Sequence, residues 1–163
     1  MQIKPANLAD LPAVTSLSEK IWRTHYRGMI TAAQIEYMLS QAYSVVSFER
    51  EIGNGATLDL LYIENKMIGF AEYMPINETD EMKLQKLYVD PSVQGKGLGS
   101  ALMEHVITST RSLGYRNLTL NVNKQNHNAI ALYEKHNFRR AASVFVPIGG
   151  GYHVDDYIMS RQV

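Results

Sequence analysis

Three glycines at alternate positions mark the segment of this sequence whose residue types most directly suggest chemistry. Gly95, Gly97 and Gly99 stand in the run QGKGLGS of residues 94–100, between a predicted strand and a predicted helix. A helix N-terminus carries free N–H groups and the positive end of the helix dipole, and glycines let a ligand approach the backbone closely. Such a loop favours phosphate oxygens, and Lys96 adds a cation. A turn in which glycines serve only geometry is the alternative, but three glycines exceed what a turn needs.

Individual residues exclude two common phosphate-binding loops. The dinucleotide fingerprint G-x-G-x-x-G requires glycine where Ser100 stands, together with an acidic residue about 20 positions later. Between Glu104 and Glu134 the sequence has no Asp or Glu. The nucleoside-triphosphate loop G-x-x-x-x-G-K-[ST] is also absent. A phosphate bound here therefore belongs to another class of ligand.

A second polar segment, residues 121–138, runs from the end of a predicted strand into a predicted helix. Ala129, Leu132 and Tyr133 share one face of this helix, and Phe138 follows its end. A single tyrosine is more often a core residue with a satisfied hydroxyl, so Tyr133 alone indicates no function.

A carboxylate lies among apolar residues in a strand predicted over 67–74. With a period of two, Glu72 shares a face with Phe70 and Met74, which is unusual for a carboxylate unless it lines a pocket. If the alternation is offset, Glu72 points to solvent instead. Four histidines are further candidate bases: His25, His127, His136 and His153. A position on the protein surface is more common for such a histidine than a catalytic one.

The elements that must position these residues change in type along the chain. Apolar residues at helical spacing after the N-cap Asn7 predict a helix over about 8–25, and start signals at Thr31 and Ser44 predict two more. The remaining expected elements are strands over 57–63, 67–74, 82–89 and 117–122, helices over 98–113 and 127–136, and two terminal strands.

The order of these elements predicts an α+β fold. Strands 57–63 and 67–74 form an antiparallel hairpin, and residues 82–122 form one βαβ unit. In that unit we expect Leu87–Val89 and Leu118–Leu120 to lie parallel, joined by a right-handed crossover. The chain is thus expected to be a single domain over 1–163, with a mixed central sheet and flanking helices.

The composition is that of a soluble globular protein and excludes several classes. Of the 163 residues, 45% are hydrophobic and 20% are charged, which excludes disorder and coiled coil. Lys+Arg and Asp+Glu both number 16, and no basic, aromatic stripe occurs, so we expect no nucleic-acid partner. The absence of cysteine excludes thiolate metal sites and acyl-cysteine chemistry, and we expect no metal.

Charge is shared unevenly between the two halves of the chain. Residues 1–80 hold 6 basic and 10 acidic side chains, whereas residues 81–163 hold 10 and 6. The asymmetry suggests an anionic ligand for the second half and a cationic one for the first, although an uneven solvated surface gives the same count. Because neither a signal peptide nor a membrane-spanning run is evident, we expect a cytoplasmic protein that does not contact membranes.

Together, the two polar segments resemble motifs of the GCN5-related N-acetyltransferase (GNAT) superfamily. The family's phosphate motif, [Q/R]-x-x-G-x-[G/A], is matched by residues 94–99. Its downstream motif, N-x-x-A-x-x-[L/F]-Y-x-x-x-G-F, is matched at Asn126, Ala129, Leu132, Tyr133 and Phe138. Asn137 stands where glycine is usual, and asparagine tolerates the same backbone conformation. The resemblance covers nearly the whole chain.

The resemblance implies that acetyl-coenzyme A binds in a gap between splayed parallel strands and that the acetyl group passes directly to an amine in a ternary complex. The backbone expected to pair with the pantetheine arm is that of Leu87, Tyr88 and Val89. The residues expected to hold the diphosphate are Gln94, Gly95, Lys96, Gly97, Leu98, Gly99 and Ser100.

The resemblance also implies roles for three side chains near the thioester. Asn126 contacts the arm, Tyr133 lies beside the sulfur as the acid, and Glu72 is the candidate base, acting through water. A thiol has a pKa near 8.5 and a phenol near 10, so proton transfer from Tyr133 is uphill by about 2 kcal/mol. Tyr133 is therefore expected to act as a hydrogen-bond donor that gives up its proton late.

Acceptor contacts are expected from the first helices and the terminal hairpin. Trp22, His25 and Tyr26 cluster at the end of the first helix, and Asp155 and Asp156 interrupt the last strand. The expected acceptor site consists of Trp22, Tyr26, Glu72 and Asp155. The run at 148–159 is similar to the ends of GNAT members near the polyamine acetyltransferases, which favours a small cationic amine. A protein N-terminus or lysine as acceptor, and a catalytically silent acyl-coenzyme A sensor, stay open. Dimers are common in the family, which allows a homodimer.

Overall fold

The computed structural model describes residues 1–93 and 95–163. Its helices, in chain order, are the 3-10 helix η1 (Leu8–Asp10), α1 (Leu11–His25), α2 (Ala32–Ala42), α3 (Val45–Gly53), the 3-10 helix η2 (Pro91–Val93), α4 (Leu98–Ser112) and α5 (His127–Lys135). Its strands are β1 (Gln2–Pro5), β2 (Thr57–Ile63), β3 (Lys66–Pro75), β4 (Glu81–Val89), β5 (Asn117–Asn123), β6 (Arg139–Gly149) and β7 (Tyr152–Gln162).

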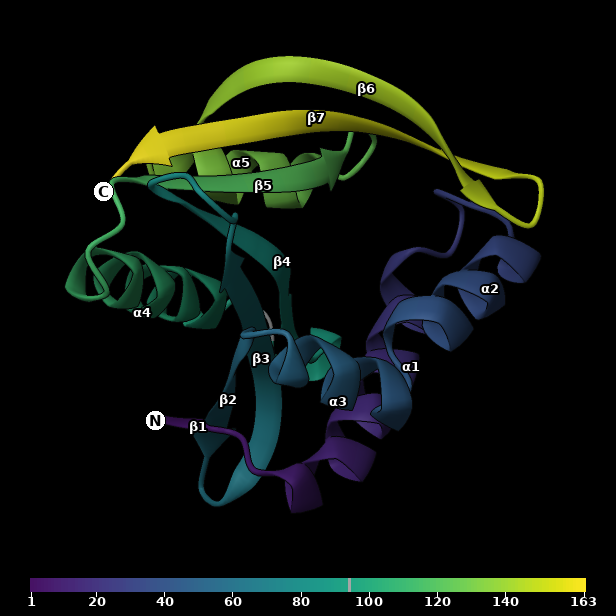
Figure 1. Cartoon of the computed structure of the whole chain (residues 1–163). Helices are drawn as coiled ribbons and strands as arrows, with labels where there is room; N and C mark the ends of the chain where they lie inside the picture. Colours follow the sequence, from purple (N-terminus) through teal and green to yellow (C-terminus); the bar gives the residue numbers. More distant parts are fainter. Residues whose placement is uncertain (94) are drawn as a thin grey trace.

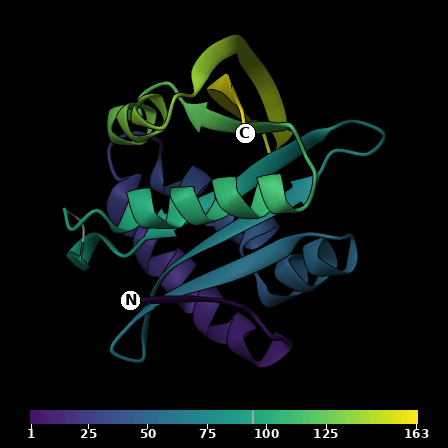
Figure 2. The same cartoon turned by 90° about the vertical axis from the view of Figure 1, so that its left-hand side faces the viewer.

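Within the described residues, the strands form one mixed sheet in the order β1-β2-β3-β4-β5-β7-β6 (Figure 1). The β4–β5 pair is parallel, and the other neighbouring pairs are antiparallel. Helices α1 to α3 lie on one side of the β1–β4 part of the sheet, and α4 crosses the other side (Figures 1 and 2). The expected α+β fold with flanking helices is confirmed.

Two apolar clusters hold these layers together. One packs α4 and α5 against the sheet and includes Leu102 and Leu118, and the other packs α1 to α3 against Leu60 and Phe70 on the opposite face. The side chains of Leu60, Phe70, Leu102 and Leu118 are essentially fully buried. Burying such side chains stabilises the fold by about 1.5–3 kcal/mol each, which fixes the helices as a frame around the sheet.

Local capping explains why the predicted boundaries agree closely with the structure. The side chain of Thr31 accepts a hydrogen bond from the Gln34 amide at 3.1 Å, and that of Ser44 accepts one from the Ser47 amide at 3.1 Å. Asn137 adopts the left-handed conformation, with φ 63°, after α5. These signals are local, so they can be recognised from a few consecutive residues.

One feature of the sheet differs from the expectation: strand β1 was not expected, and it exists because its four residues pair with β2. The expected parallel arrangement of β4 and β5 is confirmed. Residues 118–120 of β5 pair with 82–84 of β4, and an extra residue at Gln85 bends the following Leu87–Val89 away from β5. Among the described residues, no helix combines the length and apolar character needed to cross a bilayer.

Candidate active site

The site is created where two parallel strands separate. β4 and β5 pair only from Glu81/Asn117 to Leu84/Leu120, after which β4 continues along β3 alone. The register between β3 and β4 jumps at this point, and the bulge at Gln85 turns the second half of β4 away from β5. The edge of β4 that faces β5 beyond Leu84 therefore has backbone groups without a neighbouring strand.

A cavity of about 510 Å³ occupies this gap. Its walls come from β4 and β5, the first turn of α4, the inner face of α5, the end of α1 and strand β7. This volume is in the range of cofactor and small-substrate pockets. Elements that are distant in sequence thus contribute to one continuous space.

One end of the cavity is the N-terminus of α4. Gly97 caps the helix with φ 73°, and the first helical hydrogen bond runs from the Ala101 amide to the Gly97 carbonyl. The amides of Leu98, Gly99 and Ser100 precede that bond, so they have no partner within the helix. A Cβ built at Gly97 meets nothing within 4 Å, which leaves room for a ligand at the positive end of the helix dipole.

The cofactor-binding residues expected in this loop are only partly placed along the cavity. Gly95 and residues 97–100 line it, whereas the exposed side chain of Lys96 does not. Gln94 lies outside the described residues. Leu87, Tyr88 and Val89 line the cavity on the β4 side.

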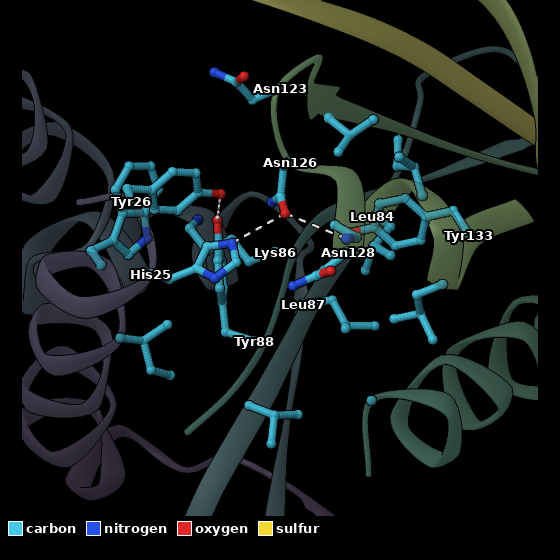
Figure 3. Close-up of a pocket in the computed structure, with 18 of the residues that line it drawn as sticks. His25, Tyr26, Leu84, Lys86, Leu87, Tyr88, Asn123, Asn126, Asn128 and Tyr133 are labelled. Atoms are coloured by element: carbon cyan, nitrogen blue, oxygen red, sulfur yellow. Dashed lines mark hydrogen bonds between the residues drawn. The ribbon is translucent and has the colours of Figure 1, made fainter. Parts of the chain in front are cut away.

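Tyr133 lines the cavity from α5, on the side opposite His25 and Tyr26 (Figure 3). Its side chain is 8% exposed and its ring packs 5.9 Å from that of Phe138, centroid to centroid. Burial raises the pKa of Tyr133 to about 12. The phenol is therefore protonated at neutral pH and available as a hydrogen-bond donor.

Asn126 connects α5 with α1 across the cavity. Its side-chain oxygen accepts a hydrogen bond from the Ala129 amide at 3.4 Å and lies 3.1 Å from His25 Nε2 (Figure 3). Because an amide oxygen only accepts, His25 must carry its proton on Nε2 in this contact. Among the described residues no group hydrogen-bonds to the other ring nitrogen, Nδ1. A neutral imidazole held in this way carries its lone pair on Nδ1, and His25 lines the cavity.

Four aromatic side chains, from the C-terminal ends of α1 and α2 and from β4, line the end of the cavity next to His25. Trp22 stacks on Tyr26 with ring centroids 4.1 Å apart, and the Tyr88 hydroxyl lies 3.1 Å from that of Tyr43 and 3.4 Å from that of Tyr26. Burial raises the pKa of Tyr88 well above the ordinary value of a phenol. The expected acceptor residues Trp22 and Tyr26 thus lie on the cavity wall, in a cluster of neutral rings.

The terminal hairpin contributes one carboxylate to the cavity. Asp156 lines the cavity, and burial, with the nearby Asp155 carboxylate, raises its pKa. Asp155, the residue expected from the sequence, lies outside the cavity lining and forms an ion pair with Lys124 at 2.7 Å. The two aspartates face opposite sides because β7 continues through both of them without interruption.

The chain matches the Acetyltransferase (GNAT) family over residues 18–138, which is most of its length. It belongs to this family. As a GNAT acetyltransferase, it uses acetyl-coenzyme A as the acetyl donor.

Relatives of this acetyltransferase act on different amines. Spermidine N(1)-acetyltransferase of Thermoplasma acidophilum is 24% identical over 144 residues, covering 85% of this chain and 88% of that protein. [Ribosomal protein bS18]-alanine N-acetyltransferase of Escherichia coli (strain K12) is 42% identical over 76 residues, covering 47% of this chain and 50% of that protein.

Solved structures share the whole fold. PaiA N-acetyltransferase from Thermoplasma acidophilum, in complex with coenzyme A, has a TM-score of 0.83 at 22% identity, with 100% of both chains covered. The ribosomal-protein-S18-alanine N-acetyltransferase from Escherichia coli has a TM-score of 0.77 at 29% identity, covering 99% of this chain and 93% of that one.

The expected base of this acetyltransferase is separated from the cavity. Glu72 is fully buried and does not line the cavity, and its Oε1 accepts a hydrogen bond from Lys86 Nζ. Lys86 does line the cavity, and its Nζ lies 5.2 Å from the ring centroids of both Tyr43 and Phe48. Burial raises the pKa of Glu72, and the Lys86 ammonium opposes this shift. Lys86 therefore stands between Glu72 and the substrate space.

Replacing Lys86 by methionine is expected to destabilise the fold by about 3–5 kcal/mol at neutral pH, because Glu72 is left as a buried charge without a partner. The loss should become smaller as the pH falls, since a buried carboxyl with a raised pKa takes up a proton more readily and becomes neutral. Equilibrium denaturation in urea at neutral and at acidic pH measures the effect. The double variant Glu72→Leu/Lys86→Met should recover most of the stability, and a single variant that loses less than about 1 kcal/mol would contradict the pairing.

The fold brings three further groups to the cavity: His25, Lys86 and Asp156. His25 was one of four candidate bases named from the sequence, and it follows Trp22 by three residues on the same helix, so the two share a face. Lys86 had no role assigned from the sequence. No comparable signal distinguished Asp156 from Asp155, because that choice depends on which face of β7 meets the cavity.

Proposed function

We propose that this acetyltransferase transfers the acetyl group directly to the primary amine of a small cationic molecule, with both substrates bound at the same time. One observation carries the proposal: a single cavity extends from the first turn of α4 past Tyr133 to Asp156. A donor and an acceptor that share one cavity can react without a covalent enzyme intermediate.

The donor half of the cavity suits coenzyme A. The amides of Leu98, Gly99 and Ser100, which have no partner within the helix, can donate to the diphosphate. The β5-facing edge of β4 beyond Leu84, which pairs with no strand among the described residues, can hydrogen-bond to the amide groups of the pantetheine arm as an added strand would. Bound acetyl-coenzyme A supplies the thioester that the amine attacks. Tyr133 donates a hydrogen bond to the sulfur, where negative charge develops.

The pKa of Tyr133 limits what its hydroxyl can do. With a pKa of about 12, against about 8.5 for a thiol, complete transfer of its proton is uphill by about 5 kcal/mol. Tyr133 therefore acts as a hydrogen-bond donor throughout most of the reaction. This view agrees with the role inferred from its sequence position and strengthens the reason for it.

We assign proton removal from the amine to His25 rather than to Glu72. An amine is ordinarily protonated at neutral pH and must lose a proton before it can attack. The Nδ1 lone pair of His25 is available in the cavity, because Asn126 fixes the proton on Nε2. Imidazole is the side chain best suited to accept a proton near neutral pH.

The acceptor half of the cavity favours a cationic molecule. The rings of Trp22, Tyr26 and Tyr88 present neutral aromatic surface, and Asp156 adds a carboxylate. Cations bind well to such surroundings through cation–π and charge interactions. The spermidine acetyltransferase relative, which covers most of this chain, also supports a cationic acceptor.

The end of the terminal hairpin supports a small acceptor. Gln34 Nε2 donates to the His153 carbonyl at 2.9 Å, and the Tyr37 hydroxyl donates to the Ile148 carbonyl at 3.0 Å. These bonds tie the hairpin to α2 next to the acceptor half and narrow the route for an extended peptide. The relation to the bS18-alanine enzyme keeps a protein N-terminus as the second candidate.

A thiol-release assay with acetyl-coenzyme A tests the proposal directly. Spermidine and other diamines should release free coenzyme A, an uncharged primary amine should do so poorly, and a peptide with N-terminal alanine serves as the competing acceptor. Turnover only with the peptide would overturn the small-amine proposal. Cofactor binding without thiol release for any amine would favour a silent acyl-coenzyme A sensor.

Replacing Asp156 by asparagine should raise KM for a cationic amine about tenfold, which corresponds to about 1.4 kcal/mol, with little change in kcat. The variant keeps the shape of the side chain and removes its charge. The same substitution at the exposed Asp155 is the matched control, and it distinguishes the residue that faces the cavity from the one expected from the sequence. Steady-state kinetics with a diamine and an uncharged amine measure both variants; equal KM changes for the two amines would contradict a charge interaction.

A further inference from the structure

A chain of hydrogen bonds begins at the first turn of α4, where the cavity ends, and runs through a buried histidine to an exposed glutamate. The hydroxyl of Ser100, in the first turn of α4, lies 3.1 Å from His136 Nε2, and His136 Nδ1 lies 2.7 Å from Glu104 Oε1. His136 is 7% exposed at the end of α5, whereas the Glu104 side chain is 61% exposed one turn after Ser100. Ser100 lines the cavity, but His136 and Glu104 do not.

The protonation state of His136 decides what the Ser100 hydroxyl can offer to a ligand. The carboxylate of Glu104 accepts a hydrogen bond, so Nδ1 carries a proton. If Nε2 lacks a proton, Ser100 must donate to it and turns only lone pairs toward the cavity. If Nε2 carries a proton, it donates to Ser100 Oγ, and the hydroxyl proton is free to donate to a phosphate oxygen.

We propose that His136 is a positioning residue for the cofactor: as an imidazolium supported by Glu104, it holds the Ser100 hydroxyl as a donor to the diphosphate. This inference rests on the proposed placement of the diphosphate at the N-terminus of α4. The bound diphosphate and the proton on His136 stabilise each other, because each requires the same orientation of the hydroxyl.

The charged groups around His136 fit this role. Glu104 on α4 contacts the ring at Nδ1, while on β7 the guanidinium of Arg161 donates a hydrogen bond to the His136 backbone carbonyl at 2.7 Å. Glu134 and Lys135, on α5 itself, are exposed, and Glu134 pairs with Arg140. Glu104 is thus the carboxylate in direct contact with the ring.

The test compares two acetyl donors, acetyl-coenzyme A and S-acetylpantetheine, which lacks the diphosphate. Glu104→Gln keeps a hydrogen-bond acceptor, removes the charge and changes an exposed side chain, so the variant should fold. It should raise KM for acetyl-coenzyme A about threefold to fivefold, and His136→Phe should raise it about tenfold, with kcat unchanged. Neither variant should change KM for S-acetylpantetheine. Glu134→Gln, an exposed glutamate that does not contact the ring, is the matched control.

A double-mutant cycle distinguishes a role of His136 that acts through Ser100 from a purely structural role. If His136 acts through Ser100, the variant Ser100→Ala/His136→Phe should raise KM for acetyl-coenzyme A no more than Ser100→Ala alone. Additive effects, or a KM change that is equal for both donors, would overturn the inference. If the wild type has the same KM for both donors, the placement of the diphosphate itself fails. If Ser100→Ala raises KM but Glu104→Gln and His136→Phe do not, only the inference about His136 fails.

Discussion

Replacing His25 by glutamine is expected to lower kcat/KM for the amine about 10²- to 10³-fold at neutral pH, because a positioned general base contributes on this scale. Glutamine can still donate a hydrogen bond to Asn126, which holds α1 against α5, so the effect should come from the lost base. Steady-state kinetics with saturating acetyl-coenzyme A measure the change.

The pH profile separates a lost base from a distorted site. A base is needed less as the free amine itself loses its proton, so the deficit of the variant should shrink as the pH rises toward the pKa of the amine, near 10, whereas a distorted site should lose activity equally at every pH. His127→Gln, at an exposed position of α5 outside the cavity lining, is the matched control. If Glu72→Gln changes the profile in a folded protein and His25→Gln does not, the base is Glu72.

Replacing Tyr133 by phenylalanine is expected to lower kcat about 10²-fold while KM for both substrates changes little, because one donor to the developing thiolate is lost. The ring remains, so its packing against Phe138 is retained. Because the pKa of Tyr133 is about 12, no loss of activity from its ionisation is expected between pH 7 and pH 10.

Two comparisons make the Tyr133 result interpretable. Tyr115→Phe removes a hydroxyl outside the cavity lining and should leave kcat unchanged. Direct titration of coenzyme A into the Tyr133→Phe protein should give wild-type affinity. Full turnover by Tyr133→Phe would remove the hydroxyl from the mechanism, and lost coenzyme A binding would indicate a structural role instead.

Most element boundaries followed from signals within a few residues. The helix expected over 98–113 is Leu98–Ser112, and the strand expected over 57–63 is Thr57–Ile63. Helix caps, glycines and apolar periodicity are properties of a few neighbouring residues, so they can be recognised from the sequence alone. Strand β1 had no such signal, because these four residues, three of them exposed, become a strand only through their pairing with β2.

The candidate site likewise combines features that contiguous motifs predict with features that depend on the fold. The glycine loop and Tyr133 were recognisable because their motifs are contiguous, and the fold places both on one cavity. The separation of β4 from β5 depends on a bulge at Gln85, which is defined only relative to β3. Whether Glu72 faces substrate depends on Lys86, which covers it.

Short runs of neighbouring residues were enough to recognise the GNAT family, the order of most elements, the glycine loop and Tyr133, while the roles of these residues toward the cofactor stay predictions. The three-dimensional arrangement was needed to see which carboxylate of the last strand lines the cavity, that His25 meets Asn126 from 101 residues away, and that His136 contacts Ser100. Such contacts join distant segments through a register or a packing angle. The strand register and the helix packing angles are set by the whole sheet and its helices, and no local sequence pattern specifies them.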